Sequence, residues 1–152
     1  MTETLNRTDR VVVLLLLVVF SSLYYATASG ITCSNDGSHY ALTRAIAEER
    51  RFTIASYDDY AEGNDVARRD GRLYSDRPPG TALFASVFYK LGGFLPEPLA
   101  PLPSRHDAEN PRLAYTLLVP VFAGAATLGL LYLTLRRLDV SPTGALTAAV
   151  AL

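Results

Sequence analysis

The sequence is poor in the residues that build several common kinds of site. It has one cysteine, Cys33, so no disulfide can form within the chain. The two histidines, His39 and His106, lie far apart and no cysteine pair accompanies them, which argues against a structural zinc site. No glycine-rich nucleotide fingerprint is present, because Gly92 and Gly93 follow an apolar helical segment and indicate its end. The sequence also contains no internal repeat.

An excess of charge of one sign is missing as well. The net charge is −1, and residues 31–112 hold ten Lys and Arg against twelve Asp and Glu. A protein that binds nucleic acid needs a basic face, so the balance excludes nucleic acid as a partner. The same balance argues against a disordered acidic tail.

Two long uncharged runs are the main feature that is present. Residues 11–28 form a run of 18, at the short end of what spans a bilayer, and residues 113–135 form a run of 23. A third apolar run occupies residues 143–152. We predict an all-α fold of polytopic membrane helices, with two spans and the start of a third. We also expect the chain to be the N-terminal piece of a longer protein, either as a natural truncation or as a partial sequence.

Basic residues at the ends of these runs predict the orientation. Arg7 and Arg10 precede the first run, and Arg136 and Arg137 follow the second. Such residues mark the cytoplasmic side of a membrane protein. Residues 1–10 and the turn at 136–142 are therefore expected in the cytoplasm of a multi-pass plasma-membrane protein. The long segment 29–112 then faces outward.

The first run has an alternative interpretation. Arg10, the apolar stretch that follows it and the small residues Ala26 and Ala28 are similar to a cleavable signal peptide, with a mature protein that begins near Ser29. Tyr24 and the adjacent tyrosine favour an uncleaved span, because aromatic residues gather at membrane interfaces.

Two short juxtamembrane helices are predicted inside the outward segment. The first is expected near 37–51, capped by Asn35 or Asp36. The second is expected near 79–91, where Pro79 suits a first helical turn and Asp76 could cap the helix. The second helix is apolar nearly all round and too short to span, so we expect it in the membrane interface or against the spans.

The rest of the outward segment is predicted to lack regular structure. Residues 56–74 are rich in Asp, Arg and Gly and are expected to form a loop with solvated acids, Asp65 among them. Residues 96–111 carry five prolines and are expected to form an extended connector.

The order of these features resembles a known class of membrane enzymes. A first span precedes Asn35-Asp36-Gly37-Ser38-His39-Tyr40; Tyr74-Ser75-Asp76-Arg77-Pro78-Pro79-Gly80 then leads an apolar helix, and Arg112-Leu113 opens the second span. This order is similar to that of the GT-C glycosyltransferases. The nearest resemblance is to the family-39-like, phospholipid-carrier-dependent transferases, which include protein O-mannosyltransferases and lipid A aminoarabinose transferases. It extends over roughly residues 11–137.

The resemblance implies an activity and a set of partners. Such enzymes move a sugar from a polyprenyl-phosphate donor to a hydroxyl of a protein, lipid or glycan acceptor on the outer membrane face. Asp36 matches the family's first-loop acid, but Gly37 stands where protein O-mannosyltransferases have Glu. Arg77 stands where the family often has Lys before Pro-Pro.

Five residues form the predicted site. Asp36 is the candidate base that takes the proton of the acceptor hydroxyl. Arg77 is the candidate ligand of the donor phosphate, because a guanidinium fork fits phosphate oxygens. His39 and Tyr40 could contact the sugar, and Asp76 either joins the substrate-binding set or caps the next helix. No cofactor is predicted with certainty; a divalent metal at Asp36 stays open, although one acid is not a metal site.

Two other functions compete with this one. The first is a non-catalytic membrane-anchored protein whose outward segment binds a partner or lipid headgroups. The second is a part of a transporter, against which we weigh the absence of ionisable residues from the two uncharged runs.

Overall fold

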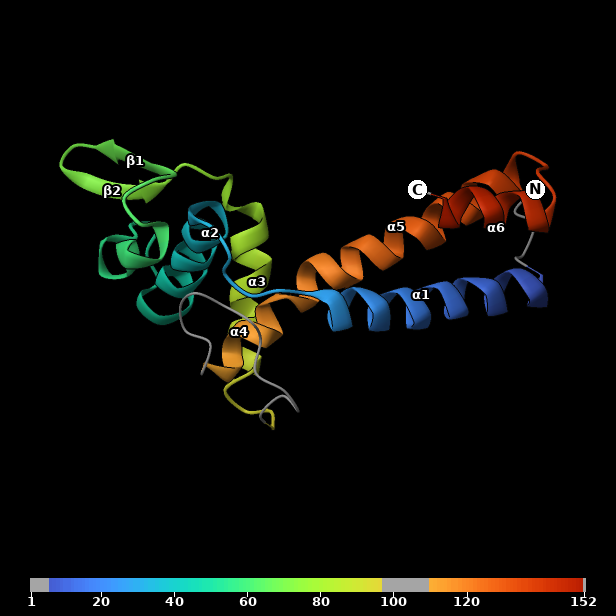
Figure 1. Ribbon diagram of the computed structural model, residues 1–152, viewed down its shortest axis with the longest axis horizontal. Helices are drawn as coiled ribbons and strands as arrows, with labels where there is room; N and C mark the ends of the chain where they lie inside the picture. The colour runs from blue at the N-terminus through green and yellow to red at the C-terminus, as the bar shows by residue number, and fades with distance from the viewer. Residues whose placement is uncertain (1–5, 97–109, 152) are drawn as a thin grey trace. The chain divides into compact units, whose positions relative to one another are not determined.

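The computed structural model describes residues 6–96 and 110–151, and these residues form two compact units (Figure 1). One unit comprises Met1–Thr27 and Pro120–Leu152, and the other comprises Ala28–Val119. We call them the helical unit and the inserted unit. Most described residues lie in helices, in agreement with the predicted helical class. The greater part of the proline-rich connector, with His106, lies outside the described residues.

The helical unit is built on two antiparallel helices. Helix α1 spans Arg7–Thr27 and α5 spans Leu118–Arg137, followed by the short helix α6, Pro142–Val150. A Cβ atom added to Gly124 would lie 2.9 Å from the Tyr24 ring, and one added to Gly129 would lie 3.4 Å from Val13. Glycine at these positions lets α5 approach α1 closely, as small residues do between membrane helices.

A buried polar cluster joins the first turn of α1 to the last turn of α5. Asp9 is 5% exposed and accepts hydrogen bonds from the Tyr132 hydroxyl at 2.7 Å and from Arg136 Nε at 2.9 Å. The first apolar helix therefore begins at Arg7 rather than at residue 11, and it includes a carboxylate. The predicted run 11–28 itself is uncharged, and Asp9 lies just before it in the same helix.

Two helices are long and apolar enough to cross a membrane, by length and composition. They are Arg7–Thr27 and the continuous stretch Pro111–Arg137, which contains α4 (Pro111–Thr116) and α5 with a turn at Leu117. In an apolar 18-residue stretch of each helix, 6% of the residues are buried within the protein in the first helix and 33% in the second. Most of their apolar side chains therefore face outward.

The inserted unit surrounds a small core with short elements (Figure 1). Between residues 28 and 96 its elements are α2 (Ser34–Arg44), the π-helical turn η1 (Ala45–Glu49), the 3₁₀ helix η2 (Ala55–Ala61), the strands β1 (Val66–Arg69) and β2 (Arg72–Ser75), and α3 (Pro79–Leu91). Fully buried side chains of α2, η1 and α3 (Ala41, Ala45 and Ala82) meet Ile54 in the centre.

The strands form an antiparallel hairpin that the sequence analysis missed. Val66 pairs with Ser75 and Arg69 pairs with Arg72. Asp70 and Gly71 form the turn with φ values of 51° and 71°. Positive φ at both central residues is the geometry of a two-residue hairpin turn, for which Asp-Gly is a favoured sequence. The prediction of a loop over 56–74 is therefore wrong for the hairpin and for η2.

The two predicted juxtamembrane helices differ in how well their bounds agree with the structure. Helix α3 has the predicted bounds, Pro79–Leu91. Helix α2 begins at Ser34, three residues early, and its last turn widens into η1. The helix-capping predictions are also wrong: Cys33 is the N-cap residue of α2 and Pro78 that of α3, and neither provides a side-chain hydrogen bond.

Candidate functional site

The predicted base, Asp36, lies in the first turn of α2, where a negative charge is favoured by the helix dipole. Its Oδ2 atom accepts hydrogen bonds from the Thr32 hydroxyl at 2.7 Å and from the Thr32 backbone amide at 3.3 Å. These bonds fix the carboxylate against the segment that enters the helix. Asp36 is exposed, so the dehydration that a general base needs would have to come from bound substrates.

His39 lies one turn after Asp36 on the same face of α2. Burial lowers the pKa of His39, the positive charge of Arg77 lowers it further, and Asp36 and Asp76 act in the opposite direction. The His39 Nδ1 atom is buried and has no hydrogen-bond partner among the residues that the structure describes. Three other predicted site residues, Asp36, Asp76 and Arg77, thus lie close enough to His39 for their charges to act on it. We call Asp36, His39, Asp76 and Arg77 the acidic cluster.

Arg77 is held in place by two carboxylates. Its Nη2 atom donates to Asp65 Oδ1 at 2.6 Å, and its Nε atom lies 3.2 Å from Asp76 Oδ1. Because a guanidinium carries five N–H donors, these contacts leave donors for a further anion. Asp76 therefore pairs with Arg77 and does not cap α3.

Asp65 binds Arg77 and holds its guanidinium in place. The prediction that Asp65 is a solvated loop acid is therefore wrong. It is half-buried, and its second oxygen accepts from the Ser34 hydroxyl at 2.5 Å. The Ser38 hydroxyl donates to the Asp65 carbonyl at 2.6 Å. The Ser34 bond, followed by Arg77, lowers the pKa of the Asp65 carboxyl despite its partial burial. Asp65 was missed because no local pattern links it to Ser34 or Arg77.

Tyr40 lies one turn after Asp36 in α2, but its side chain is buried. It is 4% exposed, and its ring centre lies 5.2 Å from that of Tyr60 and 6.1 Å from that of Tyr89. Its hydroxyl accepts a hydrogen bond from the Asn110 side chain at 3.3 Å. The structure therefore places Tyr40 in the core, which corrects the prediction that it contacts a sugar beside Asp36.

A second polar network, also missed, surrounds an ion pair at the end of α2. Arg44 lies 3.2 Å from Glu48, which also accepts hydrogen bonds from the hydroxyls of Tyr57 (2.8 Å) and Tyr89. The Arg44 Nη1 atom donates to the Tyr60 hydroxyl at 2.6 Å. We call these five residues the tyrosine network.

The charges of the tyrosine network are stabilised as they stand. Burial alone would raise the pKa of Glu48, but the bonds from Tyr89 and Tyr57 and the charge of Arg44 outweigh it and lower the pKa. Burial and the bond to Glu48 raise the pKa values of both tyrosines. Glu48 lies in the π-helical turn η1, and such turns are frequent at functional sites. Because its carboxylate is fully engaged, we assign the network to the stability of the unit.

Comparison with protein-family models, with curated proteins and with solved structures finds no match for this chain.

The acidic cluster does not fit a resident metal. Among the residues in 6–96 and 110–151, no three His, Cys, Asp or Glu side chains gather in a way that could hold a metal ion. Asp36 is bonded to Thr32, and Asp65 and Asp76 are paired with Arg77. We derive no chemical step through a metal.

Proposed function

We propose that this chain is part of a membrane glycosyltransferase that moves a sugar from a polyprenyl-phosphate donor to a hydroxyl of a protein, lipid or glycan acceptor. The observation that carries the proposal is the acidic cluster. A carboxylate in a helix's first turn, a half-buried histidine and a fixed arginine are gathered in a unit inserted between two helices that could cross a membrane.

The proposed reaction is a displacement at the anomeric carbon of the donor sugar. The Asp36 carboxylate takes the proton of the acceptor hydroxyl as the oxygen of that hydroxyl bonds to the anomeric carbon. The bond from this carbon to the phosphate oxygen breaks, and the electron pair leaves with the polyprenyl phosphate. Arg77, fixed by Asp65, donates hydrogen bonds to the leaving phosphate. His39, kept neutral by its lowered pKa, contacts the sugar.

The proposed location is the plasma membrane, with α1 and α5 as spans. Most of their apolar side chains are unburied within the protein, as lipid-facing side chains would be. The contact of Asp9 with Arg136 brings the start of α1 and the end of α5 together, so both ends belong on the same side. The arginines near these ends favour the cytoplasm for that side, and the inserted unit then faces outward.

Helix α3 offers a further contact with membrane lipids. Its residues Ala82, Ala85 and Tyr89 are buried in the inserted unit, whereas Phe84 is 69% and Val87 is 55% exposed. A helix with one packed face and one exposed apolar face is suited to the membrane interface.

The orientation can be tested on the single cysteine, because Cys33 is exposed and lies in the inserted unit. We expect a membrane-impermeant maleimide to label Cys33 in intact cells, and Cys33→Ser to abolish the label. Labelling only after permeabilisation would contradict the outward placement. The mass of the labelled chain also tests the signal-peptide alternative, which removes the residues before Ser29.

The activity can be tested with Asp36→Asn in the intact membrane protein. The amide oxygen can still accept the Thr32 bonds, but it cannot take a proton, so we expect transfer from a labelled polyprenyl-phosphate sugar to fall by about 100-fold or more. Asp59→Asn removes an exposed acid outside the cluster and should leave transfer unchanged. Transfer by Asp36→Asn at the wild-type rate would refute the role of Asp36.

A second candidate function is a non-catalytic protein whose inserted unit binds a partner. It is favoured by an arginine-lined groove that shares no residue with the acidic cluster. Absence of transfer by the wild-type protein with every polyprenyl-phosphate sugar offered would support this second function over the first.

A further inference from the structure

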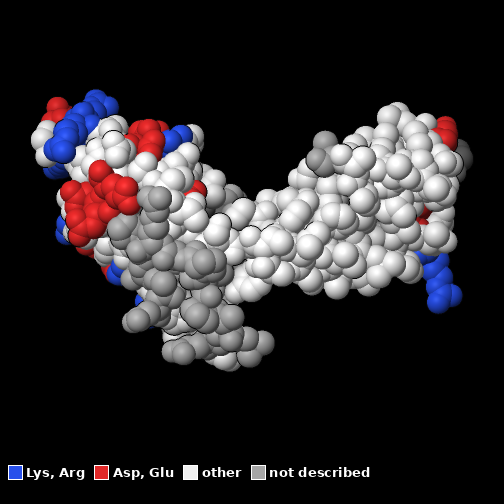
Figure 2. Space-filling view, viewed as in Figure 1, with Lys and Arg blue, Asp and Glu red and all other residues white. Residues whose placement is uncertain are grey.

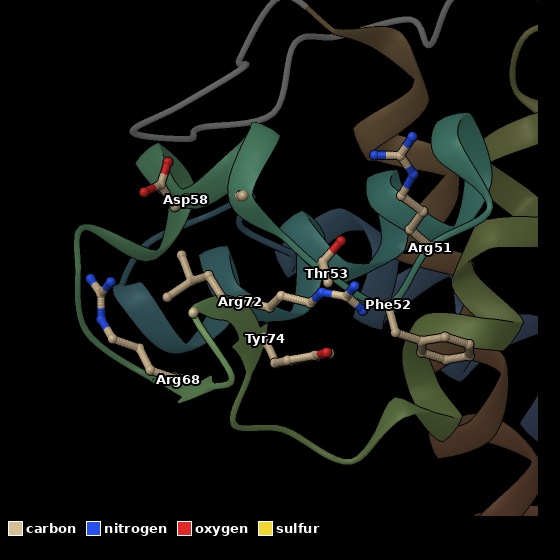
Figure 3. Close-up of a pocket in the computed structure, with 10 residues that line it drawn as sticks. Arg51, Phe52, Thr53, Asp58, Arg68, Arg72 and Tyr74 are labelled. Carbon is tan, nitrogen blue, oxygen red and sulfur yellow. The ribbon is translucent and has the colours of Figure 1, made fainter.

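A groove of about 840 Å³ opens on the inserted unit between the segment 51–58 and the hairpin (Figure 3). Its polar lining includes Arg51, Asp58, Arg68 and Arg72, and its aromatic lining is Phe52 and Tyr74. The volume is within the range of small-molecule sites, about 300–1,000 Å³, and far exceeds that of one small ion. None of these residues belongs to the acidic cluster or to the tyrosine network.

The groove has an excess of positive charge that is not neutralised within the protein. Three arginines line it against one aspartate. Arg68 and Arg72 are exposed, and neither forms an ion pair with any residue of the described ranges. Arg51 lies 4.0 Å from Glu49, and its side chain is 69% exposed. Figure 2 shows Lys and Arg atoms gathered over the hairpin.

A fourth arginine, Arg69, lies on the hairpin next to the groove residue Arg72 and adds to this excess of positive charge. Arg72 lies directly across from Arg69, and like charges in this position destabilise a strand pair. Asp70 lies 3.7 Å from Arg69 and offsets part of that repulsion on one strand. An anion bound near Arg72 would offset the rest, which couples ligand binding to the stability of the hairpin.

The aromatic residues indicate what accompanies the anionic group. Phe52 is 52% exposed at the groove, so its ring is accessible to a ligand bound there. Tyr74 is half-buried beside it in the lining. An aromatic ring offers a flat apolar surface on which the C–H face of a sugar ring can pack.

Two other kinds of polyanion fit the groove less well. An acidic peptide that adds as a strand would find the edge of β2 occupied, because Thr53 bridges Tyr74 there and the Ile54 amide donates to the Leu73 carbonyl at 2.9 Å. Nucleic acid would need a broad basic surface, whereas the acids of residues 31–112 outnumber the bases.

We propose that this groove binds an anionic glycan, with Arg68 and Arg72 on its acidic groups and Phe52 against a sugar ring. Paired N–H donors of a guanidinium suit carboxylate and phosphate oxygens equally, so either group could supply the charge. The inference is independent of the proposed transferase activity, because it concerns a different surface and is measured without a sugar donor.

The test is a binding titration of the intact chain in nanodiscs of zwitterionic lipid. The probes are a hexamer of galacturonic acid, a hexamer of a phosphorylated hexose and a neutral hexamer of galactose. We expect at least one acidic hexamer to bind and the neutral one to fail. Arg68→Gln with Arg72→Gln should weaken binding by about tenfold or more, because two charge-assisted contacts are lost. The same pair changed to Lys should lose affinity to a smaller extent.

A matched control separates the groove from general charge. Arg50→Gln with Lys90→Gln removes the same charge from exposed positions outside the lining and should leave the affinity unchanged. Circular dichroism checks that each variant is folded. Equal losses in both double variants, or equal binding of the neutral hexamer, would overturn the proposal. So would stronger binding of anionic phospholipid vesicles or of a single-stranded oligonucleotide that depends on Arg68 and Arg72.

Discussion

Gly37 is the residue of the inserted unit whose replacement the structure penalises most clearly. A Cβ atom added at Gly37 would lie 1.7 Å from the Tyr60 carbonyl oxygen and 2.5 Å from its carbonyl carbon. Both atoms are backbone, so no rotation of a side chain can relieve the clash. Alanine at position 37 would therefore push η2 away from α2 and open the core around Ala41 and Ala61, both of which are fully buried.

The size of the effect follows from two opposing contributions. Overpacking a core costs about 1–3 kcal/mol, and a clash with backbone belongs at the upper end of that range. Alanine inside a helix recovers roughly 0.5–1 kcal/mol relative to glycine. We therefore expect Gly37→Ala to lower the free energy of unfolding of the inserted unit by about 2 kcal/mol. For a domain of this size that corresponds to a fall in melting temperature of about 8–16 °C.

Near-ultraviolet circular dichroism in detergent measures this fall. The chain has no tryptophan, and six of its nine tyrosines lie in Ala28–Val119, so the signal reports mainly on the inserted unit. Gly80→Ala is the matched control, because Gly80 lies in the first turn of α3 and a Cβ atom there meets nothing within 4 Å. Gly37→Ala with a melting temperature at or above that of Gly80→Ala would refute the packing of α2 on η2.

Three further predictions concern pH, the support of the cluster and the helix pair. The pKa of His39 is lower in the folded chain, so the unfolded chain binds a proton more readily. The free energy of unfolding should therefore fall as pH drops below about 6.5. His39→Gln should flatten this dependence, as measured by denaturant titrations at about pH 5.5 and 8. Asp65→Asn should lower the melting temperature, because the Arg77 guanidinium loses its closest carboxylate, whereas Asp59→Asn should not. Gly124→Leu would collide with the Tyr24 ring and should destabilise the helical unit by about 1–3 kcal/mol, measured as unfolding in mixed micelles. An unchanged pH dependence in His39→Gln would contradict the burial of that histidine. Wild-type stability of Asp65→Asn would contradict its pairing with Arg77, and wild-type stability of Gly124→Leu would contradict the packing of α5 on α1.

The elements that the sequence predicts well are those with local signals. The two long apolar helices follow from uncharged runs, and α3 has the predicted bounds because Pro79 suits its first turn and Gly92 follows its last residue. The structure adds a second reason for Gly92: a Cβ atom there would lie 2.4 Å from the Tyr115 ring. Packing thus requires the glycine that the sequence suggests only as a stop.

The elements that were missed depend on contacts between distant residues, or on a signal that was overlooked. The Asp70-Gly71 pair is a strong hairpin signal, and it was hidden by the charged and glycine-rich composition around it. The tyrosine network has no such local signal, because Glu48 and Tyr89 lie far apart in the sequence and meet only when α3 packs on η1. Tyr40 was misplaced for a related reason: its place one turn after Asp36 does not reveal that Tyr60 and Tyr89, distant in the sequence, pack against its ring.

The glycine at position 37 also bears on where a second acid of the proposed site can lie. The resemblance proposed from the sequence would call for Glu directly after the first-loop acid, as in protein O-mannosyltransferases. Here a side chain at that position would meet the Tyr60 carbonyl, so α2 cannot carry an acid there and keep its packing on η2. Asp76, which follows β2, instead brings its charge to His39 alongside that of Asp36. A second carboxylate therefore reaches the cluster from another element, and it is Asp76, one of the five residues predicted for the site.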